Sequence, residues 1–129
     1  MIRFGAIVLA ALVFSGAARA QTLAPLSITL SNYAFAPGEL DLKVGTTYRL
    51  HFVNSASKGH NFSAPEFFAA AEIAAEDQDK VRKGLIELDS GQTIDITITP
   101  TRPGTFALEC THFMHSTMGM HGSIVVQQE

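Results

Sequence analysis

Near its C-terminus the chain reads Gly104-Thr-Phe-Ala-Leu-Glu-Cys110-Thr-His-Phe-Met-His115-Ser-Thr-Met-Gly-Met120-His-Gly122-Ser-Ile-Val-Val-Gln127. Residues 105–110 and 123–127 alternate apolar and polar side chains, which is typical of half-buried β-strands. The only cysteine of the chain, Cys110, ends the first of these strands, and the loop that follows it carries several histidines and methionines. The stretch predicts two strands of a sheet joined by a loop rich in metal-binding side chains.

The same alternation recurs earlier in the chain. It covers Ser27–Tyr33, Glu39–Val44, Thr47–Val53, Leu85–Leu88 and Thr93–Thr99. Proline and glycine residues separate several of these segments, as expected of turns. Seven or eight short strands at this spacing predict an all-β fold, a two-sheet sandwich with Greek-key connections.

One segment, residues 64–83, departs from the alternation and predicts a helical insertion of one helix or two short ones. Ser63-Ala-Pro65-Glu66 has the form of a capping box with proline in the first turn, and Gly84 is a plausible stop. An alanine-rich stretch follows the box. We expect the apolar side chains of this segment to face the sandwich, namely Phe67, Phe68 and Ile73.

The first twenty residues have the pattern of a cleaved signal peptide. Arg3 precedes an apolar run, and Ala18-Arg19-Ala20 has the form of a cleavage site, so we predict a cut after Ala20. The alternative is an uncleaved membrane anchor, although the apolar run is short for a span. We therefore expect residues 21–129 to form one exported domain without a membrane span.

The charge of this domain disfavours nucleic acid as a partner. Without Arg3 and Arg19 the chain keeps seven basic and twelve acidic side chains, a formal charge of −5. No basic run is present that could follow a phosphate backbone.

The cysteine, histidine and methionine residues have the composition of a metal site. One thiol, two imidazoles and a thioether are the donors of a trigonal copper site with a weak axial ligand. Cys110 and His115 lie on one loop, and His60 comes from a distant segment. A buried, inert cysteine and a zinc site are the alternatives, although a thioether donor favours copper.

The loop contains more histidine and methionine than one such site needs. His112 competes with His115, and Met118 competes with Met120 for the axial position. The surplus residues form either an apolar docking patch or a second, labile Cu(I) site. The additional copper ligands would be His112, Met114, Met118 and His121.

Over residues 25–127 the sequence resembles the cupredoxins, the small blue copper proteins. The motifs are His60-Asn61, Gly104-x-Phe106-x-x-x-Cys110, His115 and Gly119-Met120-x-Gly122. The loop spacing is most similar to that of the rusticyanin and sulfocyanin type. The resemblance implies one copper ion, with His60, Cys110 and His115 as equatorial ligands and Met120 as the axial ligand. It also implies that Asn61 bonds to the backbone near Thr111 and so holds the ligand geometry.

This resemblance favours a soluble one-electron carrier. Together with the short signal it also implies the periplasm, and we expect a monomer. Its partner would be a redox protein such as a cytochrome or an oxidase. The alternative is a copper chaperone, buffer or resistance protein that exchanges Cu(I) with a copper donor or acceptor. We do not expect an enzyme, because Glu109 and Thr111 flank Cys110 where the copper enzymes of this fold carry a histidine.

Overall fold

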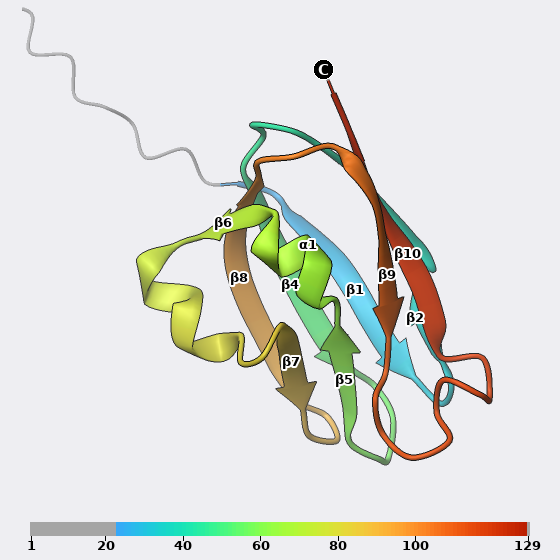
Figure 1. Cartoon of the computed structure of the whole chain (residues 1–129). Coiled ribbons are helices and arrows are strands. Elements are labelled where there is room, and N and C mark those ends of the chain that lie inside the picture. The colour runs from blue at the N-terminus through green and yellow to red at the C-terminus, as the bar shows by residue number, and fades with distance from the viewer. Residues whose placement is uncertain (1–22, 129) are drawn as a thin grey trace, which may run out of the picture.

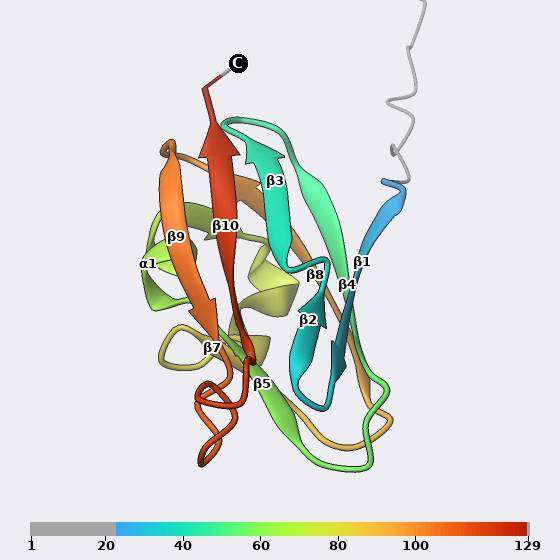
Figure 2. The same ribbon diagram turned by 90° about the vertical axis from the view of Figure 1, so that its right-hand side faces the viewer.

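The computed structural model describes residues 23–128, which form a sandwich of two five-stranded sheets (Figures 1 and 2). The first sheet has the order β2 (Ala34–Ala36), β1 (Pro25–Ser31), β4 (Tyr48–Asn54), β8 (Thr93–Pro100) and β6 (Ala71–Ile73). The second has the order β3 (Glu39–Lys43), β10 (His121–Gln127), β9 (Gly104–Glu109), β5 (His60–Ser63) and β7 (Leu85–Leu88). The predicted all-β sandwich is confirmed.

Alternating strands bury one face of each sheet in a common core. In β4, Leu50 and Phe52 are fully buried, whereas His51 between them lies on the outer face and bonds to Asp95. Two of the strand pairs are parallel, β1 with β4 and β3 with β10, and both join strands that are not consecutive in the chain. These connections give the Greek-key arrangement that the strand spacing predicted.

The predicted helical insertion is present but shorter and interrupted. It consists of α1 (Pro65–Ala69), the edge strand β6 and the 3₁₀ helix η1 (Ala75–Lys80). Of the two predicted alternatives, one continuous helix was wrong and two short helices are present, but the strand between them was not predicted. β6 pairs its backbone with β8, and these sheet hydrogen bonds override the helical preference of the alanine-rich sequence. Phe67 and Phe68 are buried as expected, and Ile73 packs against the core from β6.

The predicted capping box was also wrong. Ser63 is the last residue of β5, and Ala64 occupies the N-cap of α1 without a side-chain hydrogen bond. Pro65 does lie in the first turn of α1. The chain therefore enters this helix directly from a strand, and Ser63 keeps an extended conformation.

Gly122 lies where two backbones approach each other closely. A Cβ atom at this position would lie 2.2 Å from the carbonyl oxygen of Gly38, and the neighbouring Ser123 N–H donates to that oxygen at 3.0 Å. Gly119 instead has the positive φ of +104° that the return of the loop requires. The close contact at Gly122 brings the start of β10 against the segment between β2 and β3.

Several chain segments meet at one end of the sandwich. They are the β1–β2 turn, the start of β5, the end of β7 and the loop between β9 and β10 (Figures 1 and 2). No helix in residues 23–128 is long and apolar enough to cross a membrane. The expected signal peptide, residues 1–20, lies outside the described residues.

Candidate metal centre

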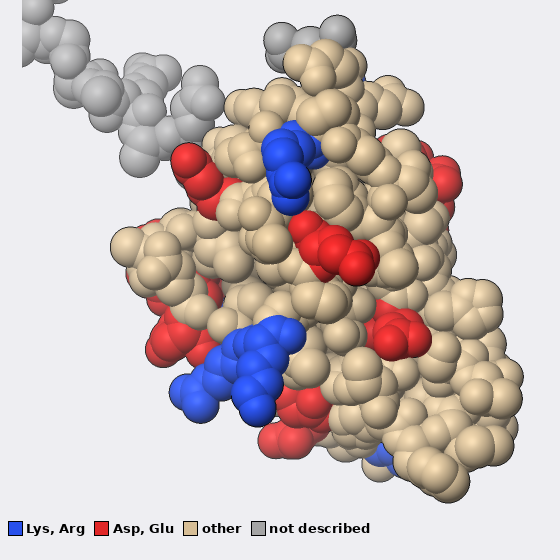
Figure 3. All heavy atoms as spheres, viewed as in Figure 1, with Lys and Arg blue, Asp and Glu red and all other residues tan. Residues whose placement is uncertain are grey.

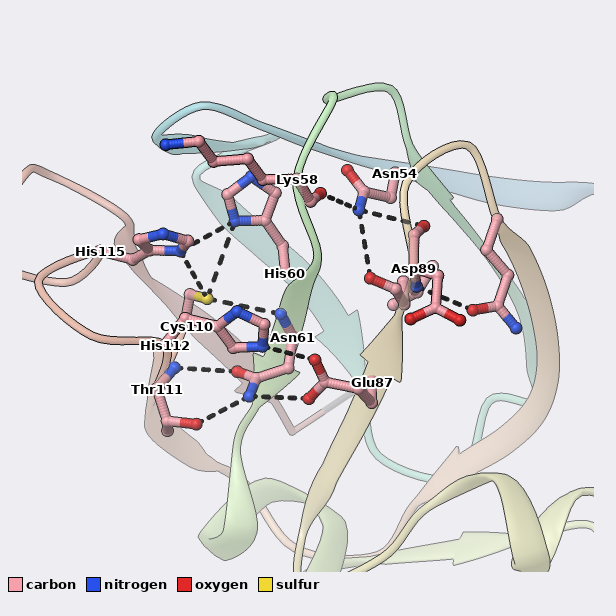
Figure 4. A network of polar contacts seen from close by, with 12 residues as sticks. Asn54, Lys58, His60, Asn61, Glu87, Asp89, Cys110, Thr111, His112 and His115 are labelled. Atoms are coloured by element: carbon pink, nitrogen blue, oxygen red, sulfur yellow. Dashed lines mark hydrogen bonds and ion pairs between the residues drawn. The ribbon is translucent and has the colours of Figure 1, made fainter.

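Three donor side chains meet at this end of the sandwich (Figure 4). His60 opens β5, Cys110 follows β9 directly, and His115 lies on the loop before β10. The Nδ1 atoms of His60 and His115 are 3.1 Å apart, and the Cys110 Sγ atom lies 3.9 Å from the first and 3.4 Å from the second. Folding thus brings together three side chains that the sequence separates by up to 55 residues.

The three donor atoms have the spacing of a metal site. All three lie within 4.8 Å of one another. Donors bound at about 2.0–2.3 Å in a trigonal plane around one ion are about 3.5–3.9 Å apart. The observed distances lie close to this range, and the mixed imidazole and thiol donors suit copper.

The β1–β2 turn orients the His60 ring. Its Nε2 atom lies 2.8 Å from Asn32 Oδ1. Because an amide oxygen accepts, Nε2 carries the proton, and the lone pair of Nδ1 faces the other donors. Tyr33, the next residue, packs its ring edge-on against His115 with centroids 5.0 Å apart. Neither Asn32 nor Tyr33 carried a sequence signal, because their contacts exist only in the folded sandwich.

Both histidines of the cluster favour the neutral form, which is the form that binds a metal. Burial lowers the pKa of His60 below its ordinary value, and the nearby His115 and His112 lower it further. Burial is also the largest cause of the lowered pKa of His115, followed by His112 and Lys58. A neutral imidazole at neutral pH needs to lose no proton before it binds an ion.

Asn61 links the strand that carries His60 to the segment that carries Cys110. Its backbone N–H donates to Cys110 Sγ at 3.4 Å. Its side-chain Oδ1 accepts from the Thr111 N–H at 2.9 Å, and its Nδ2 donates to Thr111 Oγ1 at 2.7 Å. These bonds hold the sulfur and the backbone that follows it against β5 (Figure 4).

The two methionines considered for the axial position lie in different environments. Met120 is fully buried, whereas Met118 is 55% exposed. The Met120 N–H donates to the His115 carbonyl at 3.0 Å, and the Met120 carbonyl accepts from the Cys110 N–H at 3.1 Å. The backbone of Met120 is therefore bonded directly to two residues of the donor cluster.

The surplus loop residues lie outside the group of three donors that the described residues form. The ring of His112 stacks on that of His115, with centroids 5.3 Å apart, and its Nε2 donates to the Glu87 carboxylate. The other surplus side chains are exposed, namely Met114, Met118 and His121. Phe113, which is 90% exposed, lies among them.

The segment before His60 is held by a buried amide. Asn54, at the end of β4, donates from Nδ2 to the carbonyls of Lys58, Leu88 and Asp89 at 2.8–3.2 Å. Its Oδ1 accepts from the Ala56 N–H at 3.0 Å. One fully buried side chain thus fixes the turn that leads into β5 and the end of β7 (Figure 4).

Comparison with known proteins identifies the family. A family model described as a cupredoxin-like domain matches residues 4–126. Auracyanin from the photosynthetic bacterium Roseiflexus castenholzii, solved in its dithionite-reduced form, is 21% identical; the match covers 80% of this chain and 96% of that one, with a TM-score of 0.60. Auracyanin B is 26% identical over 83% of this chain and 91% of that one, with a TM-score of 0.59. A comparison with curated protein sequences found no match. The family model covers nearly the whole chain, and the chain therefore belongs to the copper-binding cupredoxin family.

Proposed function

We propose that this protein is a one-electron carrier with a single copper ion. The ligands are His60, Cys110 and His115 in the equatorial plane, with Met120 in the axial position. The observation that carries this proposal is the convergence of two Nδ1 atoms and one thiol within 4.8 Å. The similarity to rusticyanin and sulfocyanin loops stays a prediction.

The bound copper would supply the Cu(II)/Cu(I) redox couple. The chain supplies donors whose positions do not depend on the ion. Asn32 fixes the His60 ring, Asn61 donates to the sulfur, and backbone bonds fix the Met120 backbone. Because these hydrogen bonds are internal to the fold, the donors need little rearrangement when the charge of the site changes. A site with this property suits electron transfer.

The exposed face of the loop gives a partner access to the site. His115 is half-buried, and the large apolar side chains around it are exposed, namely Phe113, Met114 and Met118. The end of the molecule that carries this loop shows few charged side chains on the face drawn in Figure 3. An apolar patch of modest size suits a transient encounter with a redox protein such as a cytochrome or an oxidase. We propose the role of carrier, in the periplasm and as a monomer, and not that of an enzyme.

A spectrum with a copper count tests the proposal. Residues 21–129, purified without metal and titrated with Cu(II), should bind one equivalent and develop an intense thiolate-to-copper visible band. Ascorbate should bleach the band and an oxidant should restore it, with copper retained throughout. A colourless protein, or one that loses copper in each cycle, contradicts the carrier function.

Copper handling is the second candidate function, and the exposure of Met114 and Met118 favours it. Thioethers bind Cu(I) preferentially, and the Met118 N–H donates to the Met114 carbonyl, so both residues lie on one turn. A handling protein would bind a second Cu(I) ion and release it to an acceptor. Titration of the reduced protein with Cu(I) distinguishes the two functions by stoichiometry.

A further inference from the structure

Glu87 lies on β7, which contributes no donor to the metal centre. Its carboxylate nevertheless contacts both of the chain segments that carry the donors. One oxygen, Oε2, accepts from Asn61 Nδ2 at 3.1 Å, and the other, Oε1, accepts from His112 Nε2. Asn61 lies on β5 beside His60, and His112 lies on the loop between Cys110 and His115. A single carboxylate therefore joins the two segments that carry the donors (Figure 4).

The backbone alone holds these two segments together weakly. β5 pairs with β7 over its full length of four residues, but with β9 at only one position, Ser63 with Glu109. Toward the site the ladder between β5 and the segment after β9 gives way to side-chain bonds. Those bonds join Asn61 with Thr111, and they join Glu87, as the acceptor, with Asn61 and His112.

The His112 ring fits closely between the two sides of the site. It stacks on the ring of His115. Its Cε1 atom would lie 3.3 Å from a Cβ atom built on Gly59, so the ring also lies close to the backbone just before His60. Glu87 fixes the ring in this place through Nε2, and the ring in turn backs the more exposed histidine of the donor cluster.

We propose that Glu87 is a positioning residue of the copper centre. By holding Asn61 and His112 at once, it keeps the loop that carries His115 closed against β5 and slows the loss of the ion. The inference rests on the proposed function for its copper readouts, but its structural part concerns the metal-free chain. The alternative is that Glu87 and His112 form an ordinary surface pair that affects neither the loop nor the loss of the ion, because their side chains are 51% and 31% exposed.

The first test uses the metal-free protein and amide hydrogen exchange. The Thr111 N–H is bonded to Asn61 Oδ1, so its exchange reports how firmly Asn61 is held. We expect Glu87→Ala to speed exchange at Thr111 by about three- to tenfold, the loss of one or two charge-assisted bonds at a partly exposed site. Glu87→Gln keeps an oxygen that accepts from Asn61 and should stay within about twofold of the wild type.

Asp89→Ala is the matched control. It removes an acidic side chain from the chain just after β7, and that side chain makes no hydrogen bond or ion pair within residues 23–128. Exchange at Thr111 should not change in this variant. Thermal unfolding of every variant checks that the fold is kept. If Glu87→Ala leaves Thr111 unchanged, or if Asp89→Ala speeds its exchange equally, Glu87 has no positioning role.

The second test uses the copper-loaded protein and the rate of Cu(II) transfer to a chelator. Glu87→Ala and His112→Ala should each speed the loss of the visible band. The two side chains act through one contact. The double variant should therefore lose the visible band more slowly than expected if the rate increases of the two single variants were multiplied. If the rate increases of the two single variants multiply fully in the double variant, Glu87 and His112 act independently, and the proposal is contradicted. If the protein binds no copper at all, the proposed function fails, and the exchange result still decides the role of Glu87 in holding Asn61.

Discussion

The metal centre has a buried half and an exposed half, built from the same kinds of side chain. His60 and Met120 are fully inaccessible, whereas His112 is partly exposed and Met118 is 55% exposed. Each buried residue is fixed by a specific hydrogen bond: His60 Nε2 donates to the Asn32 side chain, and the Met120 N–H donates to the His115 carbonyl. Burial and orientation therefore distinguish His60 and Met120 from the surplus residues, and residue type alone does not.

The exposed half of the metal centre is suited to contact with a partner protein. Phe113 and Met118 lie on a loop whose hydrogen bonds are mostly local to its own turns. Such a surface can adapt to a partner without disturbing the donors behind it. The comparison implies that substitutions in the buried half change the metal site or the fold, and that substitutions in the exposed half change docking.

The largest expected effect is the loss of the chromophore in Cys110→Ser. A serine hydroxyl does not form the soft, covalent bond of a thiolate to Cu(II), so the intense visible band should disappear. His121→Gln, in the exposed half, should keep it. Absorption spectra of both variants with one equivalent of Cu(II) check this. Loss of the visible band in both variants would contradict the distinction between the buried and the exposed half of the metal centre.

A large effect on stability is expected at Asn54. Asn54→Ala leaves three carbonyls and one N–H without their partner at a fully buried position. We expect the free energy of unfolding to fall by about 2–4 kcal/mol. Ser116→Ala, which removes a 3.3 Å bond to Glu109 on the exposed loop, should cost less than about 0.5 kcal/mol. Urea unfolding of the metal-free variants measures both, and equal losses would contradict the comparison.

The two methionines sharpen the comparison further. Met120→Leu should raise the redox potential, because an electron-pair donor is replaced by an apolar group of similar size, and the loss of a donor in a less polar site disfavours the more highly charged Cu(II). Met118→Leu should leave both the potential and the visible band unchanged, since its side chain is solvent-exposed. Voltammetry of the two variants provides the measurement. The reverse outcome would assign the axial position to Met118.

The smallest effect concerns a buried carboxylate away from the metal centre. Burial alone would raise the pKa of Asp77, but the Lys80 ammonium at 2.7 Å and the Thr97 N–H at 2.8 Å hold it below its ordinary value. The lowered pKa stabilises the fold at any pH above the unfolded value, and this contribution is lost as the pH falls through the folded one. Asp77→Asn should therefore cost about 1 kcal/mol at pH 7 and much less near pH 3.

Denaturant titrations of wild type and Asp77→Asn at both pH values provide the check. The exposed Asp79→Asn serves as the control, with little expected change at either pH. A difference for Asp77→Asn that is the same at pH 7 and pH 3 would show that its charge does not stabilise the fold. The visible spectrum of the copper-loaded variant should be that of the wild type.

Much of the strand pattern was readable from the sequence, whereas the helical segment was readable only in part. The alternation in β4 and β10 predicted both strands within one or two residues, because one face of each sheet must be apolar. The sequence over 64–83 predicted one helix or two short ones but missed β6, because pairing with the edge of β8 depends on where that edge lies. The short strand β2 was missed for a similar reason, since it is defined by its pairing with β1.

The sequence by itself determined which donors are available: one thiol, and histidines and methionines on a loop and on a distant segment. That inventory follows from residue types and spacing, which do not require coordinates. Only the tertiary structure decided which of these side chains meet, that Asn32 orients His60, that Met120 is buried while Met118 is not, and that Glu87 reaches both sides of the site. The physical reason is that strand pairing and burial are set by contacts between distant parts of the chain.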